Sequence, residues 1–219
     1  RVVGATREPD GWRIETRDAT TKTRQTYRAK ALVNAAGPWV GQLIRKEIGL
    51  PSAENVRLVR GSHIVTRKLF DHEKCYFFQG TDGRIIFAIP YESDFTLIGT
   101  TDVEHDTDPS EVFATEEEKN YLCAFASEYF AIPVTADDIV WTYSGVRPLY
   151  DDGATSATAA TRDFVLSYDD TSAPLLNVFG GKITTHWKLA EEAVEKIAAT
   201  LGPSGGRWTA GAALPGGDF

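Results

Sequence analysis

Residues 177–201, NVFGGKITTHWKLAEEAVEKIAATL, contain the change from strand to helix on which the prediction of this fold rests. An apolar run typical of a strand occupies 175–179 and stops at the pair Gly180-Gly181. A helix is predicted soon after it, because apolar residues recur at spacings of three and four along one face. These residues are Trp187, Ala190, Val194, Ile197 and Leu201, and we expect them to be buried.

The turn between this strand and this helix also has the properties of a binding site. Two glycines let a ligand approach bare backbone N–H groups at the positive end of the helix dipole. Lys182, Thr184 and Thr185 add a cation and two hydroxyls at the same place. The pattern predicts a site for a phosphate, a carboxylate or the N1/C2=O edge of a reduced flavin. The alternative, an ordinary turn with Lys182 in solvent, stays open on these residues alone.

Composition indicates a globular protein and excludes some partners. The 219 residues, 25% charged and 42% hydrophobic, suffice for one large domain or two small ones. No apolar run approaches the roughly 20 residues of a membrane-spanning helix. The net charge of −8 argues against nucleic acid as a partner, because a phosphate backbone attracts a basic surface.

Cysteine and acidic residues give no sign of a metal site. Cys75 and Cys123 are too few and too isolated for a metal site or a disulfide framework, and we expect both to be buried free thiols. Asp102 and Glu104 could be metal ligands, but no third ligand has a suitable spacing. We therefore predict no metal ion.

The beginning of the sequence leads us to expect a piece of a longer protein. Methionine is absent from all 219 residues, including the first position. The chain opens at Arg1, in what the alternating pattern indicates is the middle of a β-meander.

Strand patterns dominate the first half of the chain. Polar and apolar residues alternate over 12–17 and 23–29, which predicts a hairpin. A nearly continuous apolar run at 31–36 is typical of a strand buried in a parallel sheet. Further strands predict an antiparallel sheet, with hairpin turns at Asp82-Gly83 and Ser93-Asp94. These strands are 56–66, 75–79, 84–91 and 95–101.

The second half combines helices with strands. Residues 115–118, Thr-Glu-Glu-Glu, form a capping box that opens an amphipathic helix through Tyr129. A strand at 139–146 ends in Arg147-Pro148, and a loop at 153–161 precedes strands at 163–167 and 175–179. This order suggests an α/β portion that holds both chain ends and an inserted antiparallel sheet. The predicted parts are 1–49, 50–145, 146–201 and a linker-like tail, 202–219.

Two side chains are candidates for chemistry. His63 lies inside a predicted strand, where a neutral imidazole could be a general base or a hydrogen-bonded structural residue. Arg147 follows an apolar strand, where a guanidinium can hold a carboxylate or phosphate through two hydrogen bonds. The alternative for Arg147 is a surface ion pair with Asp151 or Asp152. The small, polar segment 99–104 fits a turn and a pocket wall equally well.

Residues 34–39, NAAGPW, form a second junction of strand and helix, with Gly37-Pro38 at the break. A dinucleotide binds where parallel strands end and small residues permit a close approach. By itself this motif is not specific, because Ala-Ala-Gly after a strand is common.

Seven segments between about residues 30 and 200 carry a more specific signal together. They are LVNAAGPWV, RGSHIV, IIFAIPY, LIGTTDVE, DDIVWTYSGVRPL, TRDFVL and VFGGKITTHWKLAE. In this order and spacing they resemble the flavin-dependent glycerol-3-phosphate dehydrogenase family. The resemblance implies an α/β (α+β) fold of the D-amino-acid-oxidase type. In it, a Rossmann-like FAD-binding domain (1–49 and 146–201) is interleaved with an antiparallel substrate-binding cap (50–145).

The resemblance also implies roles for residues. Arg147 resembles the substrate-binding arginine in front of the flavin, and His63 a polar residue that could take the hydroxyl proton. Lys182 would lie beside the reduced flavin, whose negative charge the helix dipole would stabilise. Two segments would contact the flavin. They comprise Ala36, Gly37 and Trp39 in the first, and Gly181, Lys182, Ile183 and Thr184 in the second.

The implied reaction is oxidation of sn-glycerol 3-phosphate at C2 to dihydroxyacetone phosphate, with hydride moving to N5 of FAD. Electrons would then pass to a membrane quinone, from an enzyme that is cytoplasmic and peripheral on the inner face of the membrane. Three alternatives remain: a glycerol-3-phosphate oxidase that uses O₂, an amino- or imino-acid oxidase in which Arg147 binds a carboxylate, and an inactive cap module.

The chain departs from the family in two respects. The N-terminal GxGxxG segment, which cradles the FAD pyrophosphate, does not occur in these 219 residues, and the family's C-terminal helical region is missing as well. The chain therefore resembles a central piece of the enzyme. We expect this piece alone to be inactive and colourless, without flavin absorbance at about 450 nm.

Overall fold

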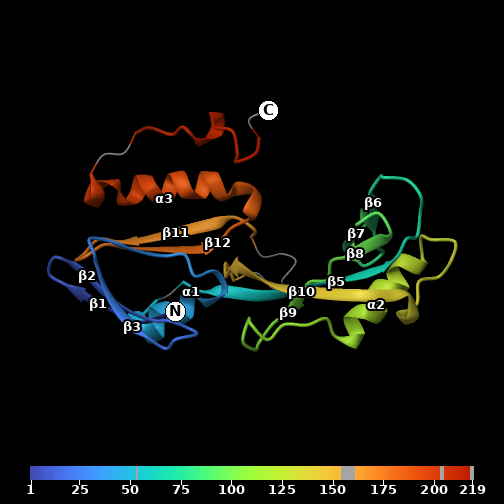
Figure 1. Cartoon of the computed structure of the whole chain (residues 1–219), viewed down its shortest axis with the longest axis horizontal. Coiled ribbons are helices and arrows are strands. Elements are labelled where there is room, and N and C mark those ends of the chain that lie inside the picture. Colours follow the sequence, from blue (N-terminus) through green and yellow to red (C-terminus); the bar gives the residue numbers. More distant parts are fainter. Residues whose placement is uncertain (53, 154–160, 203–204, 218–219) are drawn as a thin grey trace. The chain divides into compact units, whose positions relative to one another are not determined.

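The computed structural model describes residues 1–52, 54–153, 161–202 and 205–217 (Figure 1). The chain divides into two compact units. The first contains Arg1–Arg57 and the described residues from Pro148 onward, and the second contains Leu58–Arg147. Each unit has a hydrophobic core of its own and is described separately. Most of the loop predicted over 153–161 lies outside the described residues.

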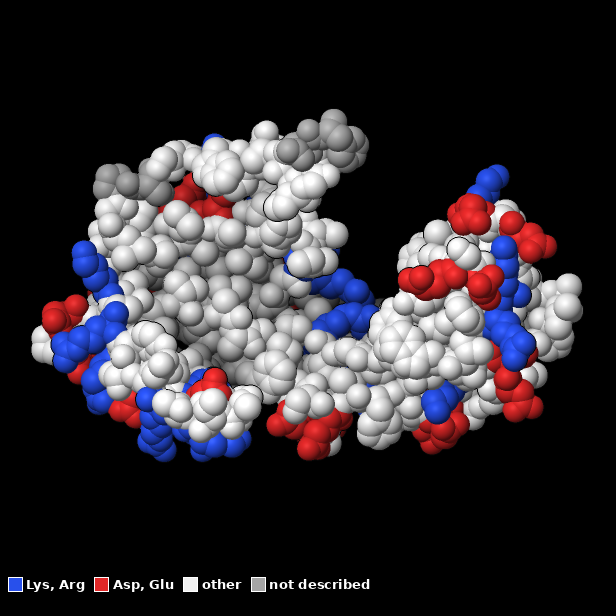
Figure 2. Space-filling model, in the orientation of Figure 1, with Lys and Arg blue, Asp and Glu red and all other residues white. Residues whose placement is uncertain are grey.

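The first unit begins with a three-stranded antiparallel sheet. Its strands are β1 (Val2–Glu8), β2 (Gly11–Arg17) and β3 (Arg24–Ala29). The pairing of β2 with β3 confirms the hairpin predicted over 12–17 and 23–29. Buried Trp12 donates from Nε1 to the carbonyl oxygen of Pro174 at 2.8 Å, which ties this sheet to a later segment of the unit. Acidic and basic side chains are interspersed over the surface of these strands (Figure 2).

A second sheet in this unit has the strand order β11-β12-β4. Its strands are β11 (Phe164–Asp169), β12 (Leu175–Gly180) and β4 (Leu32–Asn34). β12 is antiparallel to β11 and parallel to β4, which confirms the strands predicted at 163–167 and 175–179 and the parallel pairing expected for 31–36. β4 is shorter than predicted, and Val33 within it is 42% exposed, so the burial expected for this run is wrong at Val33.

Helical segments follow β4 and β12, as predicted. After β4 come a 3₁₀ turn, η1 (Gly37–Trp39), then α1 (Val40–Gln42) and a π-helical turn, η2 (Leu43–Ile48). After β12 come the 3₁₀ turn η4 (Ile183–Thr185) and the long helix α3 (His186–Leu201). Among the described helices, none is long and apolar enough to cross a membrane.

The predicted burial of the apolar face of α3 is wrong for the described chain. Trp187, Val194 and Leu201 are 40%, 44% and 54% exposed, because β11, β12 and the residues near the C-terminus cover α3 incompletely. The residues after α3 nevertheless pack along it. Arg207 forms two hydrogen bonds of 2.6 and 2.7 Å with Glu195, just before the 3₁₀ turn η5 (Thr209–Gly211). This part of the predicted linker is therefore held against the helix.

The second unit is built on a sheet with the order β10-β5-β8-β7-β6, in which β9 also pairs with β5. The strands are β5 (Val56–Arg67), β6 (Tyr76–Gln79), β7 (Ile85–Tyr91), β8 (Phe95–Gly99), β9 (Val103–Glu104) and β10 (Ile139–Tyr150). The β5–β8, β5–β9, β6–β7 and β7–β8 pairs are antiparallel, which confirms the predicted sheet and both of its hairpin turns. β10 continues through Arg147 and Pro148, so the strand end predicted at residue 146 is wrong. The edge position of β10 tolerates a proline.

Helix α2 (Glu116–Ser127) packs against one face of this sheet and confirms the predicted capping box. Thr115 Oγ1 accepts from the N–H of Glu118, and the Glu118 carboxylate accepts from the N–H of Thr115. Cys123 is buried in the core between helix and sheet, as predicted. The predicted burial of Cys75 is wrong: Cys75 is exposed and lies just before the edge strand β6. The core residues are Ile64, Phe78, Ile86, Ala88, Ile98, Leu122, Cys123, Phe125, Ala126 and Val134.

The opposite face of the sheet is more open. His63 of β5, Gly99 of β8 and Phe87 of β7 are successive register partners and therefore share this face. Phe77 and Phe87 are 59% and 40% exposed. This face, and not the one beneath α2, carries the candidate side chains for chemistry.

Candidate functional site

His63 lies between an aromatic ring and a glycine. Its imidazole stacks on Tyr143 of β10, with ring centroids 4.7 Å apart and an interplanar angle of 7°. It also packs over its register partner Gly99, where a Cβ atom would lie 2.7 Å from His63 Cγ. The strand position predicted for His63 is therefore confirmed, and Gly99 leaves the space that the imidazole occupies.

The surroundings of His63 favour the neutral form of its imidazole. Burial lowers the pKa of His63 below its ordinary value of 6.5, and the positive charge of Arg147 lowers it further. Nδ1 is buried and has no hydrogen-bond partner in the described chain. A neutral imidazole has a lone pair that can accept a proton, which is the property a general base needs.

The guanidinium of Arg147 is held by the segment 100–102. Its Nη1 donates to Asp102 Oδ1 at 2.8 Å and to the carbonyl oxygen of Thr101 at 3.3 Å. Its Nη2 donates to Thr100 Oγ1 at 2.9 Å. From the sequence alone, the segment 99–104 could be a turn or a pocket wall. In the structure, residues 100–102 accept hydrogen bonds from the guanidinium of Arg147 and hold it in place.

Gly61 of β5 lies against the same guanidinium. A Cβ atom at Gly61 would lie 2.5 Å from Arg147 Cζ, closer than atoms can approach. Gly61 and His63 are two residues apart in one strand, so they lie on the same face of the sheet. The structure therefore places His63 and Arg147 on one face of the neighbouring strands β5 and β10.

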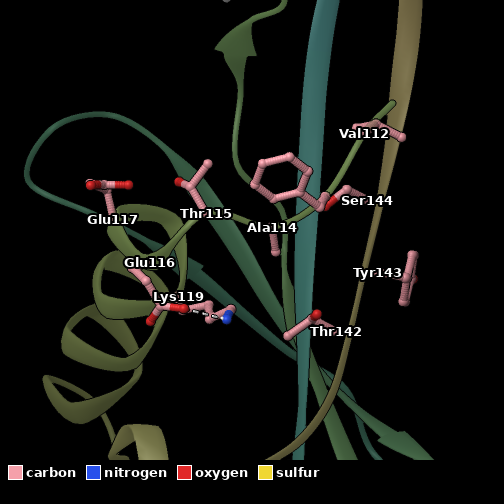
Figure 3. Close-up of a pocket in the computed structure, with 10 residues that line it drawn as sticks. Val112, Ala114, Thr115, Glu116, Glu117, Lys119, Thr142, Tyr143 and Ser144 are labelled. Atoms are coloured by element: carbon pink, nitrogen blue, oxygen red, sulfur yellow. Dashed lines mark hydrogen bonds and ion pairs between the residues drawn. The ribbon is translucent and has the colours of Figure 1, made fainter. Parts of the chain in front are cut away.

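A hollow of about 670 Å³ lies beside β10 (Figure 3). Its lining comes from the segment 112–115, the first turn of α2 and residues 142–144 of β10. Tyr143 belongs to this lining and also stacks on His63. Neither His63 nor Arg147 lines the hollow, which borders α2, so the hollow is not the site of these two side chains.

The two segments predicted to contact flavin follow neighbouring strands of the first unit. Residues 36–39 follow β4, residues 181–184 follow β12, and these strands are parallel. The carboxyl ends of parallel strands meet at one edge of a sheet, where nucleotides bind in α/β folds. Buried Asn34 and Asn177 join the two strands, with Asn34 Nδ2 donating to Asn177 Oδ1 at 3.0 Å.

Asn34 also shapes the first of these segments. Its Oδ1 accepts from the N–H of Ala36 at 3.3 Å, and its Nδ2 donates to the carbonyl oxygen of Val40 at 3.1 Å. Gly37 has a φ of +56° within this turn, a conformation that favours glycine, and Trp39 is 39% exposed. Sequence reasoning overlooked Asn34, whose only signal was a polar residue at the end of an apolar strand.

The second segment has the bare backbone that the sequence predicts. Gly180 and Gly181 have φ values of +69° and +99°, which residues other than glycine rarely adopt. Residues 182–184 are exposed and lie directly before α3, at the positive end of its dipole. With Lys182 as a cation at the same turn, these groups fit the electron-rich edge of a flavin ring.

The candidate residues therefore form two sets. His63 and Arg147 belong to the second unit, whereas Lys182 and both flavin segments belong to the first. Sequence reasoning missed Gly61 and Gly99, although a glycine inside a strand often marks a close approach. No group of three or more His, Cys, Asp or Glu side chains in the described part of the chain could hold a metal ion.

The similarity of this chain to known proteins extends over nearly its whole length. Residues 1–187 match the family model DAO, described as FAD dependent oxidoreductase. The D-erythritol 1-phosphate dehydrogenase of Brucella abortus is 45% identical over 219 residues, which cover 100% of this chain and 44% of that protein. The aerobic glycerol-3-phosphate dehydrogenase of Escherichia coli is 46% identical over 99% of this chain and 44% of that protein. The chain thus spans less than half the length of these curated relatives.

One solved structure is similar in fold as well as in sequence. It is the glycerol-3-phosphate dehydrogenase from Bacillus halodurans complexed with FAD, with a TM-score of 0.84 and 32% identity. The match covers 99% of this chain and 42% of that chain. Both units therefore have counterparts in that structure.

Proposed function

The chain belongs to the DAO family of FAD dependent oxidoreductases, and on that premise we propose that the protein containing it oxidises sn-glycerol 3-phosphate at C2. Its α/β fold is of the D-amino-acid-oxidase type, as predicted. The observation that carries the proposal is the position of His63 and Arg147 on one face of the sheet. Two relatives at 45% and 46% identity are named as dehydrogenases of phosphorylated polyols, which supports this class of substrate.

We assign the first unit to the FAD-binding domain. The turn at 181–184, of which residues 182–184 are exposed, and the turn at 36–39 would lie against the flavin, at the shared edge of β12 and β4. Lys182 and the dipole of α3 would stabilise negative charge there. When bound, FAD supplies the ring that accepts a hydride from the substrate.

We assign the second unit to the substrate-binding cap. The bonds from Arg147 to residues 100–102 fix the plane of its guanidinium, and a fixed plane favours two-point contact with substrate oxygens. His63, neutral because of burial and of Arg147, would take the proton from the C2 hydroxyl. Oxidation at C2 would yield dihydroxyacetone phosphate.

The direct test is turnover by the full-length protein with an artificial electron acceptor. We expect sn-glycerol 3-phosphate to be oxidised and dihydroxyacetone phosphate to form in equal amount, and an absence of turnover would overturn the proposal. D-erythritol 1-phosphate is a second candidate substrate, because the relative named for it is 45% identical across this whole chain. The ratio of kcat/KM for the two substrates decides between them.

The electron acceptor and the location are parts of the same proposal. We propose a membrane quinone as acceptor, with the enzyme peripheral on the inner face of the membrane. Quinone reduction without peroxide is the expected result, and peroxide formed in step with product would indicate an oxidase instead. Turnover of amino or imino acids in preference to polyol phosphates would assign Arg147 to a substrate carboxylate.

A further inference from the structure

A buried carboxylate joins helix α2 to the segment that supports Arg147. Glu118 is 4% exposed, although its side chain is charged. Its Oε1 accepts from Ser62 Oγ at 2.8 Å and from Thr101 Oγ1 at 2.7 Å, and its Oε2 lies 3.0 Å from Arg60 Nε. Its partners therefore come from β5 and from the segment 100–102 as well as from its own helix.

These contacts exceed what a helix cap requires. A capping box needs only that the carboxylate accept from the N–H of the N-cap residue, as Glu118 does from Thr115 at 3.0 Å. The chain contains a second capping box, in which Asp138 accepts from the N–H and the hydroxyl of Thr135 at 2.7 and 2.8 Å. Asp138 is less buried, and its cap serves the 3₁₀ turn η3 (Ala136–Asp138). The two boxes thus form a natural comparison.

Thr101 connects Glu118 to Arg147, because its side chain contacts Glu118 and its carbonyl oxygen contacts Arg147. Its side-chain oxygen donates to Glu118 and accepts from the N–H of Ser62 at 2.9 Å. Its carbonyl oxygen accepts from Arg147 Nη1, between the contacts of Arg147 with Thr100 and Asp102. Thr101 is 1% exposed, so moving its side chain would also move the carbonyl that contacts the guanidinium.

We propose that Glu118 is a positioning residue, which fixes the segment 100–102 and thereby the plane of the Arg147 guanidinium. This inference rests on the proposed function, because that function assigns Arg147 to the substrate. Burial raises the pKa of Glu118, but hydrogen bonds from Thr101, Thr115 and Ser62 and the charge of Arg60 outweigh it, so the pKa is lowered overall. The group is therefore a charged acceptor, which holds hydroxyl donors more strongly than a neutral amide would.

The test compares Glu118→Gln with Asp138→Asn in the full-length enzyme. Each variant replaces the carboxylate of one capping box by an amide, but only Glu118 contacts the segment 100–102. We expect Glu118→Gln to lower kcat/KM roughly 10- to 100-fold, mainly through KM, because misplacing a substrate-binding group by about 1 Å has effects of this size. Asp138→Asn should leave kcat/KM within about twofold of the unmutated enzyme. Equal kcat/KM in the two variants overturns the proposal.

Amide hydrogen exchange supplies a readout that does not depend on activity. Exchange at residues 100–102 should be faster in Glu118→Gln and unchanged in Asp138→Asn. Unchanged exchange in both variants overturns the inference. If the unmutated enzyme oxidises no polyol phosphate, the proposed function fails on its own, and the exchange result still decides whether Glu118 holds the segment.

A second pair of variants covers the case in which Glu118→Gln does not fold. Thr101→Val removes the hydroxyl at nearly constant volume, whereas Thr101→Ser keeps it. We expect Thr101→Val to raise KM and Thr101→Ser to retain most of the activity. Equal kcat/KM in the valine and serine variants shows that the bond to Glu118 does not position the segment.

The link to Arg147 is tested by combining variants. In an Arg147→Ala background, Glu118→Gln should change kcat/KM by less than about twofold, because the group that it positions is gone. A full additional loss in that background would show that Glu118 acts by another route and would overturn the proposal.

Discussion

Gly61 lies against the guanidinium of Arg147, so closely that a Cβ atom at Gly61 would be 2.5 Å from Arg147 Cζ. The two residues come from the neighbouring strands β5 and β10. Glycine therefore gives Arg147 the space to extend across β5 and reach residues 100–102. A residue without a side chain helps to determine where the cation lies.

Gly61→Ala in the full-length enzyme should lower kcat/KM roughly 10- to 100-fold, because the added methyl group must displace the guanidinium. Overpacking should also lower the free energy of unfolding by about 1–3 kcal/mol. Gly145→Ala is the matched control, since a Cβ atom at Gly145 meets nothing within 4 Å. Steady-state kinetics and urea unfolding of both variants make the comparison. Equal kcat/KM in the two would show that the contact of Gly61 with Arg147 has no role in catalysis.

Arg147→Lys should be nearly as damaging as Arg147→Ala. Arg147 donates in two directions, from Nη1 and from Nη2, and lysine offers one ammonium with less directional control. Arg207→Lys is the control, because Arg207 forms an exposed ion pair with Glu195, a kind of pair that contributes little and that lysine can also form. The measurement is kcat/KM for sn-glycerol 3-phosphate. If lysine alone restores activity, charge suffices; if both variants of Arg147 are fully active, Arg147 is outside the site.

The pKa of His63 predicts a dependence on pH. Because this pKa lies below its ordinary value of 6.5, the unfolded chain binds the proton more readily than the folded chain does. The free energy of unfolding should therefore fall as the pH falls through and below 6.5. His63→Asn should flatten that part of the profile, which chemical denaturation at several pH values measures.

The same group should control the acidic limb of activity. We expect kcat/KM of the full-length enzyme to fall with an apparent pKa below 6.5, and the low residual activity of His63→Asn to lack this limb. In Arg147→Ala the limb should move toward 6.5, because one of the two causes of the shift is removed. An acidic limb that survives in His63→Asn would assign the proton to another group.

Lys182→Ala should slow reduction of the bound flavin by the substrate. A cation at the Gly180-Gly181 turn would stabilise negative charge on the reduced ring, and losing one such interaction raises a barrier by about 2–4 kcal/mol, or roughly 10² to 10³ in rate. Lys188→Ala, in α3, is the control, since Lys188 is 54% exposed and lies 4.0 Å from Glu192. Stopped-flow absorbance measures the rate. A change within about twofold for Lys182→Ala would mean that Lys182 is only a surface residue.

Most local elements were predictable because the residues that encode them are close in the chain. The turns at Asp82-Gly83 and Ser93-Asp94, the capping box of Thr115 and Glu118, and the Gly180-Gly181 turn each depend on conformations or bonds within a few residues. Errors arose where the surroundings decided the outcome. β10 runs through Pro148 because it is an edge strand, and Cys75 is exposed because it adjoins one.

The sequence by itself therefore determined the elements, their order and the residue types available for chemistry. Only the tertiary structure decided which of these residues meet. Asp102 contacts Arg147 across 45 positions of sequence, Ser62 contacts Glu118 across 56, and Asn34 contacts Asn177 across 143. The physical reason is that hydrogen bonds and close packing act over a few ångströms, and strand order and register, rather than local pattern, bring distant residues within that range.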